Sequence, residues 1–270
     1  MSLVKCQDNS KLIARQLLGK LEESTSKDLF SKQSKEYAVS RPTYPESLFD
    51  FLAGLVDRKD LAWDCATGNG QAAVALSKYF RRVIASDISE KQIGNAKRKS
   101  NIRYEVFPAE KAILEDDSVD LITVAQALHW FNFKEFYKEA RRVLRKGGVI
   151  AAWAYGLHSI SPEIDKVACY LYEDILGKYW PKERKYIENR YEDVPFPFKQ
   201  LLTPQFQIEL NWNLSELVNY FYTWSSVQKF LEKNNHDPVK QILGELEEAW
   251  GSQQRRQIAW PIYINVGRFI

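Results

Sequence analysis

Short apolar runs alternate with amphipathic stretches between residues 45 and 154. An apolar run bounded by turn-forming residues predicts a buried strand, and apolar positions that recur every three or four residues predict a helix. The apolar runs predict strands at 61–65, 82–87, 102–107, 119–125 and 148–154. The amphipathic stretches predict helices that begin near Pro45 and at 71–79, 89–99 and 133–144. Strands that alternate with helices of this length are typical of an α/β protein with a doubly wound, mostly parallel sheet.

The pattern changes after Trp153. Residues 156–200 are rich in Tyr, Trp, Pro and charged residues, and contain one predicted helix near 162–176. Alternation of apolar and polar residues predicts strands at 205–212 and 258–270. Apolar periodicity between these strands predicts helices at 214–221, 225–233 and 238–250. The polar N-terminal stretch contains one short amphipathic helix, at about 11–22.

We therefore expect a single domain that is assembled from four parts of the chain. Residues 1–45 form an N-terminal helical segment, and 46–154 form the core that binds the ligand. Residues 155–203 form a helical, aromatic insertion. Residues 204–270 supply the last strands and a helical cap, and so complete the sheet.

Composition narrows the class of protein. A chain of 270 residues can bury a full α/β core with room for one insertion. The net charge of +3 comes from mixed charges and not from a basic tract, so we expect no nucleic-acid partner. We also expect no membrane span and no signal peptide, because no apolar stretch is long enough. Cys6, Cys65 and Cys169 are widely separated, which argues against a disulfide framework or a metal site and favours a reducing, cytoplasmic setting.

The most informative stretch is the turn Asp64-Cys-Ala66-Thr-Gly68-Asn-Gly70, between a predicted strand and a predicted helix. Glycines let a backbone approach a ligand closely, and a helix start offers unpaired N–H groups. The next strand ends in Asp87, about twenty residues on, where a carboxylate can accept hydrogen bonds from ribose hydroxyls. The acid before the glycines would repel a pyrophosphate but suits a cationic ligand. The turn also lacks the glycine spacing of a nicotinamide-dependent dehydrogenase.

This turn resembles the first motif of class I S-adenosylmethionine-dependent methyltransferases, which reads acid-x-Gly-x-Gly-x-Gly. The resemblance implies a Rossmann-like seven-stranded sheet that is closed by a C-terminal antiparallel hairpin, with the last strand between the fifth and sixth. It also implies S-adenosyl-L-methionine as cofactor, bound by Asp64, Ala66, Gly68 and Gly70. Ala66 replaces the first glycine of the motif, and we expect a slightly altered turn there.

Further cofactor contacts are implied by the same resemblance. Asp87 would bind the ribose diol and Ile88 would cover the adenine, although Asp87 could instead cap the following helix. Ala109 and Glu110 would read the adenine edge. Pro108 stands where the family has an aspartate, and Glu110 could instead be an exposed loop acid. Gln126 would meet the methionine part, because it follows the fourth strand at the ligand-binding edge of the sheet.

Two segments resemble the small-molecule methyltransferases similar to trans-aconitate methyltransferases. They are Tyr37-Ala-Val-Ser-Arg41-Pro-Thr-Tyr44-Pro and Ala-Gln-Ala-Leu-His129-Trp-Phe. In that branch the N-terminal segment folds over the cofactor, which implies that Tyr37 and Arg41 reach the methionine carboxylate. Arg41 could instead cap a helix, and Tyr37 and Tyr44 could pack in the core.

His129 is the candidate catalytic residue, as a general base for a phenol, an amine or an activated carbon. A histidine beside Trp130 could equally be a packed structural residue, and a carboxylate acceptor would need no base. The aromatic insertion could form a lid over the acceptor or pack on the sheet. Four basic residues of the insertion could bind an acidic acceptor or could form a solvated helix face, namely Lys178, Lys182, Arg184 and Lys185.

The sequence as a whole predicts methyl transfer from S-adenosylmethionine to a small molecule, with a carboxylic acid as one acceptor class. Two alternatives stay open. One is a cofactor-binding protein of the same fold without turnover, to which Ala66 and Pro108 point. The other is a methyltransferase that acts on a macromolecule, which would require a basic groove or a recognition module.

Overall fold

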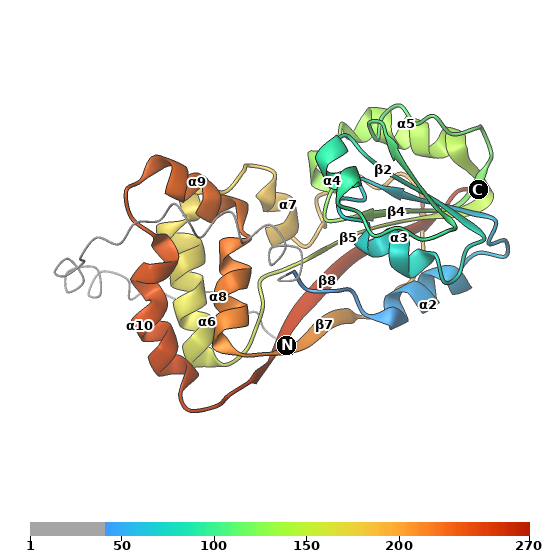
Figure 1. Cartoon of the computed structure of the whole chain (residues 1–270). Coiled ribbons are helices and arrows are strands. Elements are labelled where there is room, and N and C mark those ends of the chain that lie inside the picture. The colour runs from blue at the N-terminus through green and yellow to red at the C-terminus, as the bar shows by residue number, and fades with distance from the viewer. Residues whose placement is uncertain (1–40) are drawn as a thin grey trace. The chain divides into compact units, whose positions relative to one another are not determined.

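The computed structural model describes residues 41–270, which form two compact units (Figure 1). The sheet unit contains residues 43–157, 182–209 and 259–270. The helical unit contains the described residues up to Pro42, together with 158–181 and 210–258. The predicted helix at 11–22 and Tyr37 lie outside the described residues. The division of the domain into four parts stays a prediction.

Most elements of the sheet unit occur where the apolar pattern predicts them. Its strands are β1 (Leu61–Cys65), β2 (Arg82–Asp87), β3 (Ile102–Val106), β4 (Val119–Ala125), β5 (Leu144–Tyr155) and β6 (Lys199–Gln200). Its helices are α2 (Glu46–Gly54), α3 (Gln71–Leu76), α4 (Glu90–Gly94), the 3-10 helix η1 (Leu128–Trp130), α5 (Phe133–Val143) and α7 (Arg184–Glu188). The strands β7 (Phe206–Trp212) and β8 (Arg256–Arg268) each begin in one unit and end in the other.

The sheet has the order β3-β2-β1-β4-β5-β8-β6, and β7 also pairs with β8. Strands β1 to β5 pair in parallel, whereas β8 runs antiparallel to β5 and to β6. This confirms a mostly parallel, doubly wound sheet in which the last strand lies between the fifth and sixth. The sheet has eight strands and not seven, because the short strand β6 forms within the predicted insertion.

Helices cover both faces of the sheet, because its central strands are buried on both sides (Figure 1). On one face Phe136 of α5 packs against Trp63 of β1, with ring centroids 6.4 Å apart. On the other face Phe49 of α2 packs against Trp153 of β5, at 6.1 Å. The carboxyl ends of β1, β2 and β4 therefore share one edge of a rigid, well-packed sheet.

Three predicted helices are shorter or less regular than the pattern suggests. Helix α3 ends at Leu76 and not at residue 79, and residues 77–79 form a turn. Helix α4 ends at Gly94 and not near residue 99, because it has one buried residue, Ile93, and a glycine at its end. The helix predicted near 162–176 divides into α6 (Pro162–Cys169) and a π-helical turn, η2 (Tyr170–Ile175).

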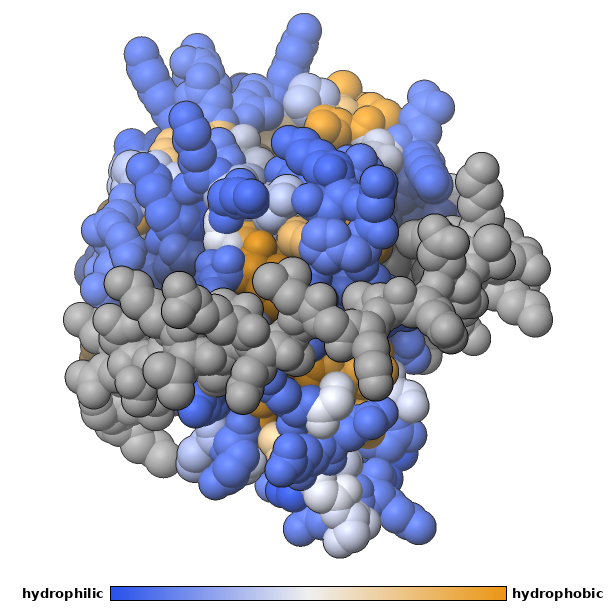
Figure 2. Space-filling model, turned by 90° about the vertical axis from the view of Figure 1, so that its left-hand side faces the viewer, coloured by the Kyte–Doolittle hydropathy of each residue, from blue (hydrophilic) through white to orange (hydrophobic). Residues whose placement is uncertain are grey.

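The helical unit contains α6, η2, the 3-10 helix η3 (Gly177–Tyr179), α8 (Leu214–Tyr222), α9 (Ser225–Lys233) and α10 (Pro238–Trp250). Its helices are amphipathic: α10 buries Val239, Ile242, Leu246 and Trp250 and exposes charged residues between them. The face shown in Figure 2 is accordingly hydrophilic over most of its coloured surface, with small hydrophobic patches. Within residues 41–270 no helix combines the length and apolar character that crossing a membrane would require.

Candidate functional site

The turn after β1 holds three residues in the left-handed backbone conformation. Their φ angles are +54° at Ala66, +56° at Gly68 and +83° at Gly70. Glycine adopts this conformation without strain, whereas an alanine there costs about 1 kcal/mol. The turn thus keeps the glycine-type conformation at Ala66. A Cβ at Gly70 would overlap the Tyr104 hydroxyl, whereas open space surrounds Gly68.

Asp64 lies beneath this turn. Its side chain is 1% exposed, and its carboxylate accepts hydrogen bonds from the hydroxyls of Thr67 at 2.5 Å and Thr123 at 2.8 Å. Burial raises the pKa of Asp64 from 3.8 to about 6, although these hydrogen bonds oppose the shift. The Asp64 carboxylate therefore connects the turn to β4, because it is hydrogen-bonded to Thr67 in the turn and to Thr123 in β4. Its predicted role as a cofactor contact stays a prediction.

Cys65, the next residue, is fully buried. Burial and the charges of nearby acids raise its pKa well above the ordinary value, so the thiol stays protonated. Its environment is that of a packed small residue and not that of a nucleophile.

Asp87 ends β2 beside the turn. One carboxylate oxygen accepts a hydrogen bond from the Gly68 amide at 2.9 Å, and the other accepts one from the Ser89 amide at 2.9 Å. A carboxylate can accept about four hydrogen bonds, so capacity for ribose hydroxyls remains. The cap of α4 comes from the Ser89 side chain, which accepts from Gln92. Ile88 is 75% exposed, although isoleucine is among the residues most often buried in proteins.

Ala109 and Glu110 lie in the loop that follows β3. Ala109 is buried against the hydrophobic core. A Glu110 carboxylate oxygen accepts a hydrogen bond from the Asn132 amide at 3.0 Å, at the start of α5. Glu110 is therefore partly engaged in structure, and its role in reading adenine stays a prediction.

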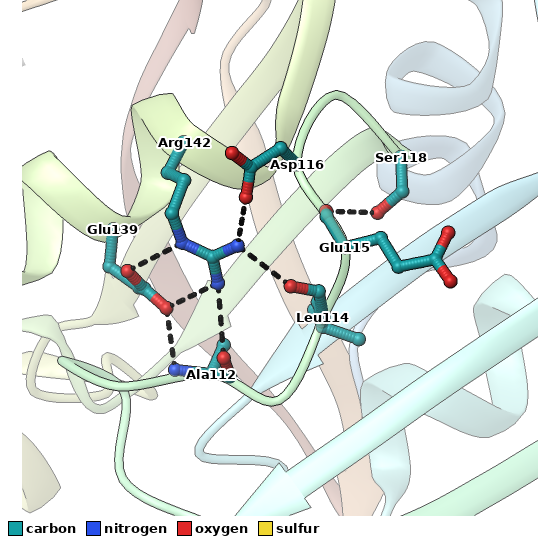
Figure 3. A network of polar contacts seen from close by, with 7 residues as sticks. All are labelled: Ala112, Leu114, Glu115, Asp116, Ser118, Glu139 and Arg142. Atoms are coloured by element: carbon teal, nitrogen blue, oxygen red, sulfur yellow. Dashed lines mark hydrogen bonds and ion pairs between the residues drawn. The ribbon is translucent and has the colours of Figure 1, made fainter.

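Arg142 of α5 holds the next part of this loop (Figure 3). Its guanidinium donates to the carbonyls of Ala112 at 3.0 Å and Leu114 at 2.8 Å, and it pairs with Asp116. Glu139 accepts two hydrogen bonds from Arg142 and one from the Ala112 amide at 2.7 Å. One helix thus fixes the backbone just beyond the predicted adenine-reading residues.

Gln126 follows β4 with a φ angle of +58°, and its backbone N–H donates a hydrogen bond to the backbone carbonyl of Trp153 at 2.8 Å. A non-glycine residue in the left-handed region indicates local strain, which is common at binding sites. This turn directs the chain from β4 into η1, where His129 lies.

His129 is 7% exposed, and its Nδ1 lies 2.8 Å from the Tyr191 hydroxyl. Burial, together with the positive charge of Arg184, lowers the pKa of His129 from 6.5 to about 4. The ring also packs against Trp130, with centroids 5.2 Å apart. At neutral pH His129 is therefore an uncharged imidazole.

The sheet unit brings together most of the predicted site residues at one edge, namely Asp64, Ala66, Gly68, Gly70, Asp87, Ile88, Ala109, Glu110, Gln126 and His129. Arg41 belongs to the helical unit, where its guanidinium donates to the carbonyl of Thr223 at 3.3 Å. Its predicted contact with the methionine carboxylate stays a prediction.

Thr123, Tyr104 and Tyr191 were not predicted as site residues, because no local motif marks them. The insertion itself is divided: Tyr172 and Trp180 pack together in the helical unit, whereas Tyr191 contacts His129 in the sheet unit.

Comparison with known proteins identifies the family. A family model described as a methyltransferase domain matches residues 63–152, from β1 to β5. A Dictyostelium discoideum protein named as a methyltransferase is 37% identical over 249 residues, which cover 89% of this chain and 95% of that protein. This chain belongs to the methyltransferase family. The methyltransferase is also similar to a solved structure described as a type II methyltransferase from Anaeromyxobacter dehalogenans. That chain is 41% identical, with a TM-score of 0.80 and coverage of 84% of this chain and 97% of the other.

The cofactor of this methyltransferase is S-adenosylmethionine. A Saccharomyces cerevisiae protein named as S-adenosylmethionine-dependent is 31% identical over 167 residues, which cover 54% of this chain and 55% of that protein. The residues at the sheet edge fit the cofactor: Gly68 has open space above it, Asp87 retains acceptor capacity and Ile88 presents an apolar surface.

Proposed function

We propose that this methyltransferase transfers the methyl group of S-adenosylmethionine to a carboxylate oxygen of a small organic acid. The sulfonium supplies an electrophilic methyl carbon. The chain's own residues then have to bind the acid, orient it and exclude water. A carboxylate oxygen forms a bond to the methyl carbon as the bond from carbon to sulfur breaks. No proton is released, so this reaction requires no general base.

The environment of His129 carries this proposal. Its pKa of about 4 makes the imidazole a weak proton acceptor at neutral pH, which suits a carboxylate better than a phenol or an amine. The cause of the shift is also informative. Part of it comes from Arg184, whose positive charge acts on both His129 and Tyr191. A positive charge at this place favours an anionic acceptor.

The resemblance to trans-aconitate methyltransferases supports the same class of acceptor. It rests on the Ala-Gln-Ala-Leu-His129-Trp-Phe segment and on the segment from Tyr37 to Pro45. Arg184 is also one of the four basic residues of the insertion that could bind an acidic acceptor or could form a solvated helix face. We therefore place this methyltransferase in the small-molecule branch as part of the proposal.

The experiment has two steps. Calorimetry with S-adenosylmethionine, S-adenosylhomocysteine and NAD first tests cofactor binding, and we expect micromolar binding of the first two only. The protein is then incubated with S-adenosylmethionine and panels of mono-, di- and tricarboxylic acids, phenols and amines. Mass spectrometry detects S-adenosylhomocysteine together with the methylated product. We expect methyl esters, which mild alkali hydrolyses.

Matched variants test the role of charge. Arg184→Gln should raise the KM of the acid about tenfold, because it removes one favourable charge, and should leave cofactor affinity unchanged. Lys146→Gln is the control, since Lys146 is exposed near the amino end of β5 and is not one of the candidate acceptor-binding residues. Methylation of phenols or amines alone would refute the acid acceptor. Cofactor binding without turnover on any panel would favour the binding protein.

A further inference from the structure

The contact between His129 and Tyr191 bears on which ring nitrogen of His129 carries the hydrogen. Tyr191 is 1% exposed, and its hydroxyl lies 2.8 Å from Nδ1 of His129. Within residues 41–270 this is the one hydrogen bond that the Tyr191 hydroxyl makes with another side chain. The two residues are 62 positions apart and come from η1 and from the segment after α7.

Only one arrangement of protons satisfies both side chains. If the Tyr191 hydroxyl donates to Nδ1, the phenolic proton and the Nδ1 lone pair are both paired, and Nε2 carries the ring hydrogen. If Nδ1 donates to the Tyr191 oxygen, the phenolic proton is left buried without an acceptor among the described side chains, which is costly.

The other ring nitrogen, Nε2, makes no hydrogen bond within residues 41–270. The contacts of the ring in that part of the chain involve Nδ1 and the rings of Trp130 and Tyr191. Helix η1, which carries His129, follows β4 at the carboxyl edge of the sheet, where a ligand of an α/β sheet binds.

The backbone holds Tyr191 in place at a cost. Arg190 and Tyr191 have φ angles of +55° and +61°, which are unfavourable for non-glycine residues. The Tyr191 amide donates to the carbonyl of Tyr186 at 2.7 Å, and the Tyr191 carbonyl accepts from Asn265 at 3.2 Å. Hydrogen bonds of the Tyr191 backbone N–H and carbonyl therefore hold these two strained residues in place.

From this geometry we infer that Tyr191 is a positioning residue that locks His129 in the tautomer with hydrogen on Nε2. His129 then donates a hydrogen bond from Nε2 to an oxygen of the acceptor. The inference rests on the proposed function, and it replaces the general-base role with that of a donor. One carboxylate oxygen is held by Nε2–H while the other oxygen attacks the methyl carbon. No proton moves between His129 and the acceptor in this step.

Nitrogen-15 NMR of the cofactor-free protein tests the tautomer without any turnover. The chain has three histidines, His129, His158 and His236, so the variant His129→Gln assigns the His129 signals by their disappearance. We expect Nδ1 unprotonated and Nε2 protonated at pH 7 in the wild type. In Tyr191→Phe, which keeps the ring but loses the hydroxyl, the tautomers should mix. A protonated Nδ1 in the wild type, or an unchanged tautomer in Tyr191→Phe, would overturn the inference.

Kinetics with an accepted acid then distinguish a donor from a base. Glutamine can donate a hydrogen bond from its amide but cannot take up a proton. If His129 is a donor, His129→Gln should retain at least tenfold more kcat/KM than His129→Ala, and Tyr191→Phe should lose about tenfold. Equal loss in His129→Gln and His129→Ala would show that the donor role is wrong. The NMR result stands whichever acceptor the enzyme uses, so failure of the acid proposal and failure of the tautomer inference are distinguishable.

Discussion

The carboxylate of Asp87 accepts a hydrogen bond from the backbone amide of Gly68 at 2.9 Å. These residues are 19 positions apart, at the ends of neighbouring parallel strands. The contact ties the glycine turn to β2. Because the same carboxylate also accepts from the Ser89 amide, its position is fixed from two sides.

Replacement of Asp87 by alanine should weaken S-adenosylmethionine binding at least tenfold, because the variant loses its hydrogen bonds to the ribose and frees the turn. Gly68→Val should have the same effect, since a side chain would enter the open space and strain a left-handed residue. Calorimetry measures both affinities, and circular dichroism checks that the variants fold. Glu90→Ala, at an exposed acid nearby, is the control. Unchanged affinity in both variants would exclude this site.

Ile88→Ala should lower cofactor affinity up to about tenfold, since the exposed side chain would lose apolar contact with adenine. Its free energy of unfolding should change by less than about 0.5 kcal/mol, because Ile88 is 75% exposed. The matched control is Ile113→Ala, at an isoleucine that is 66% exposed. Equal affinities for the two variants would show that Ile88 does not cover the cofactor.

Ala66→Gly should stabilise the folded protein by about 0.5–1 kcal/mol, because glycine relieves the left-handed strain at a φ angle of +54°. The same substitution at Ala75, within helix α3, should instead destabilise it by about 1 kcal/mol. Urea denaturation measures both free energies of unfolding. A loss of stability in Ala66→Gly would contradict the strain at this position.

The raised pKa of Asp64 predicts the direction in which the free energy of unfolding changes with pH. Between its unfolded pKa of 3.8 and its folded pKa of about 6, the folded state keeps a proton that the unfolded state has released. The Asp64 contribution to the free energy of unfolding therefore falls as pH rises through this window, by at most about 3 kcal/mol.

The variant Asp64→Asn tests this sign. The free energy of unfolding of the variant minus that of the wild type should increase as pH rises from 4 to 6, because only the wild type loses the Asp64 contribution. His129 and His158 have lowered pKa values and act in the opposite direction, but they are present in both proteins and cancel in the difference. Urea denaturation at several pH values measures this difference in free energy of unfolding. A difference that does not change with pH would contradict the raised pKa of Asp64.

Arg142→Lys should destabilise the protein by about 1–3 kcal/mol. Lysine keeps the charge but cannot donate at once to Glu139, Ala112 and Leu114 (Figure 3). Since the loop also carries Glu110, cofactor affinity should fall several-fold as well. Arg103→Lys is the control, because Arg103 is exposed and, among residues 41–270, pairs with Glu105 on its own strand. Equal stability of both variants would show that the network contributes little.

The sequence alone determined the order of strands and helices and the location of the glycine turn. Both follow from local rules: the period of apolar residues sets each element, and parallel strands place their carboxyl ends at one edge. Asp87, Ile88 and Gln126 could be placed at that edge for this reason. The length of α4 was harder to predict, since it depends on how many of its residues are buried against the rest of the protein, and only Ile93 is.

Only the tertiary structure decided which distant side chains meet. Asp64 is paired with Thr123, 59 positions away, and this pairing makes it a buried support of the turn. His129 is paired with Tyr191, 62 positions away, through a turn of strained residues that no periodicity reveals. Hydrogen bonds between side chains far apart in sequence depend on the packing of whole elements. The protonation and tautomer of His129, and with them its chemistry, are therefore properties of the fold.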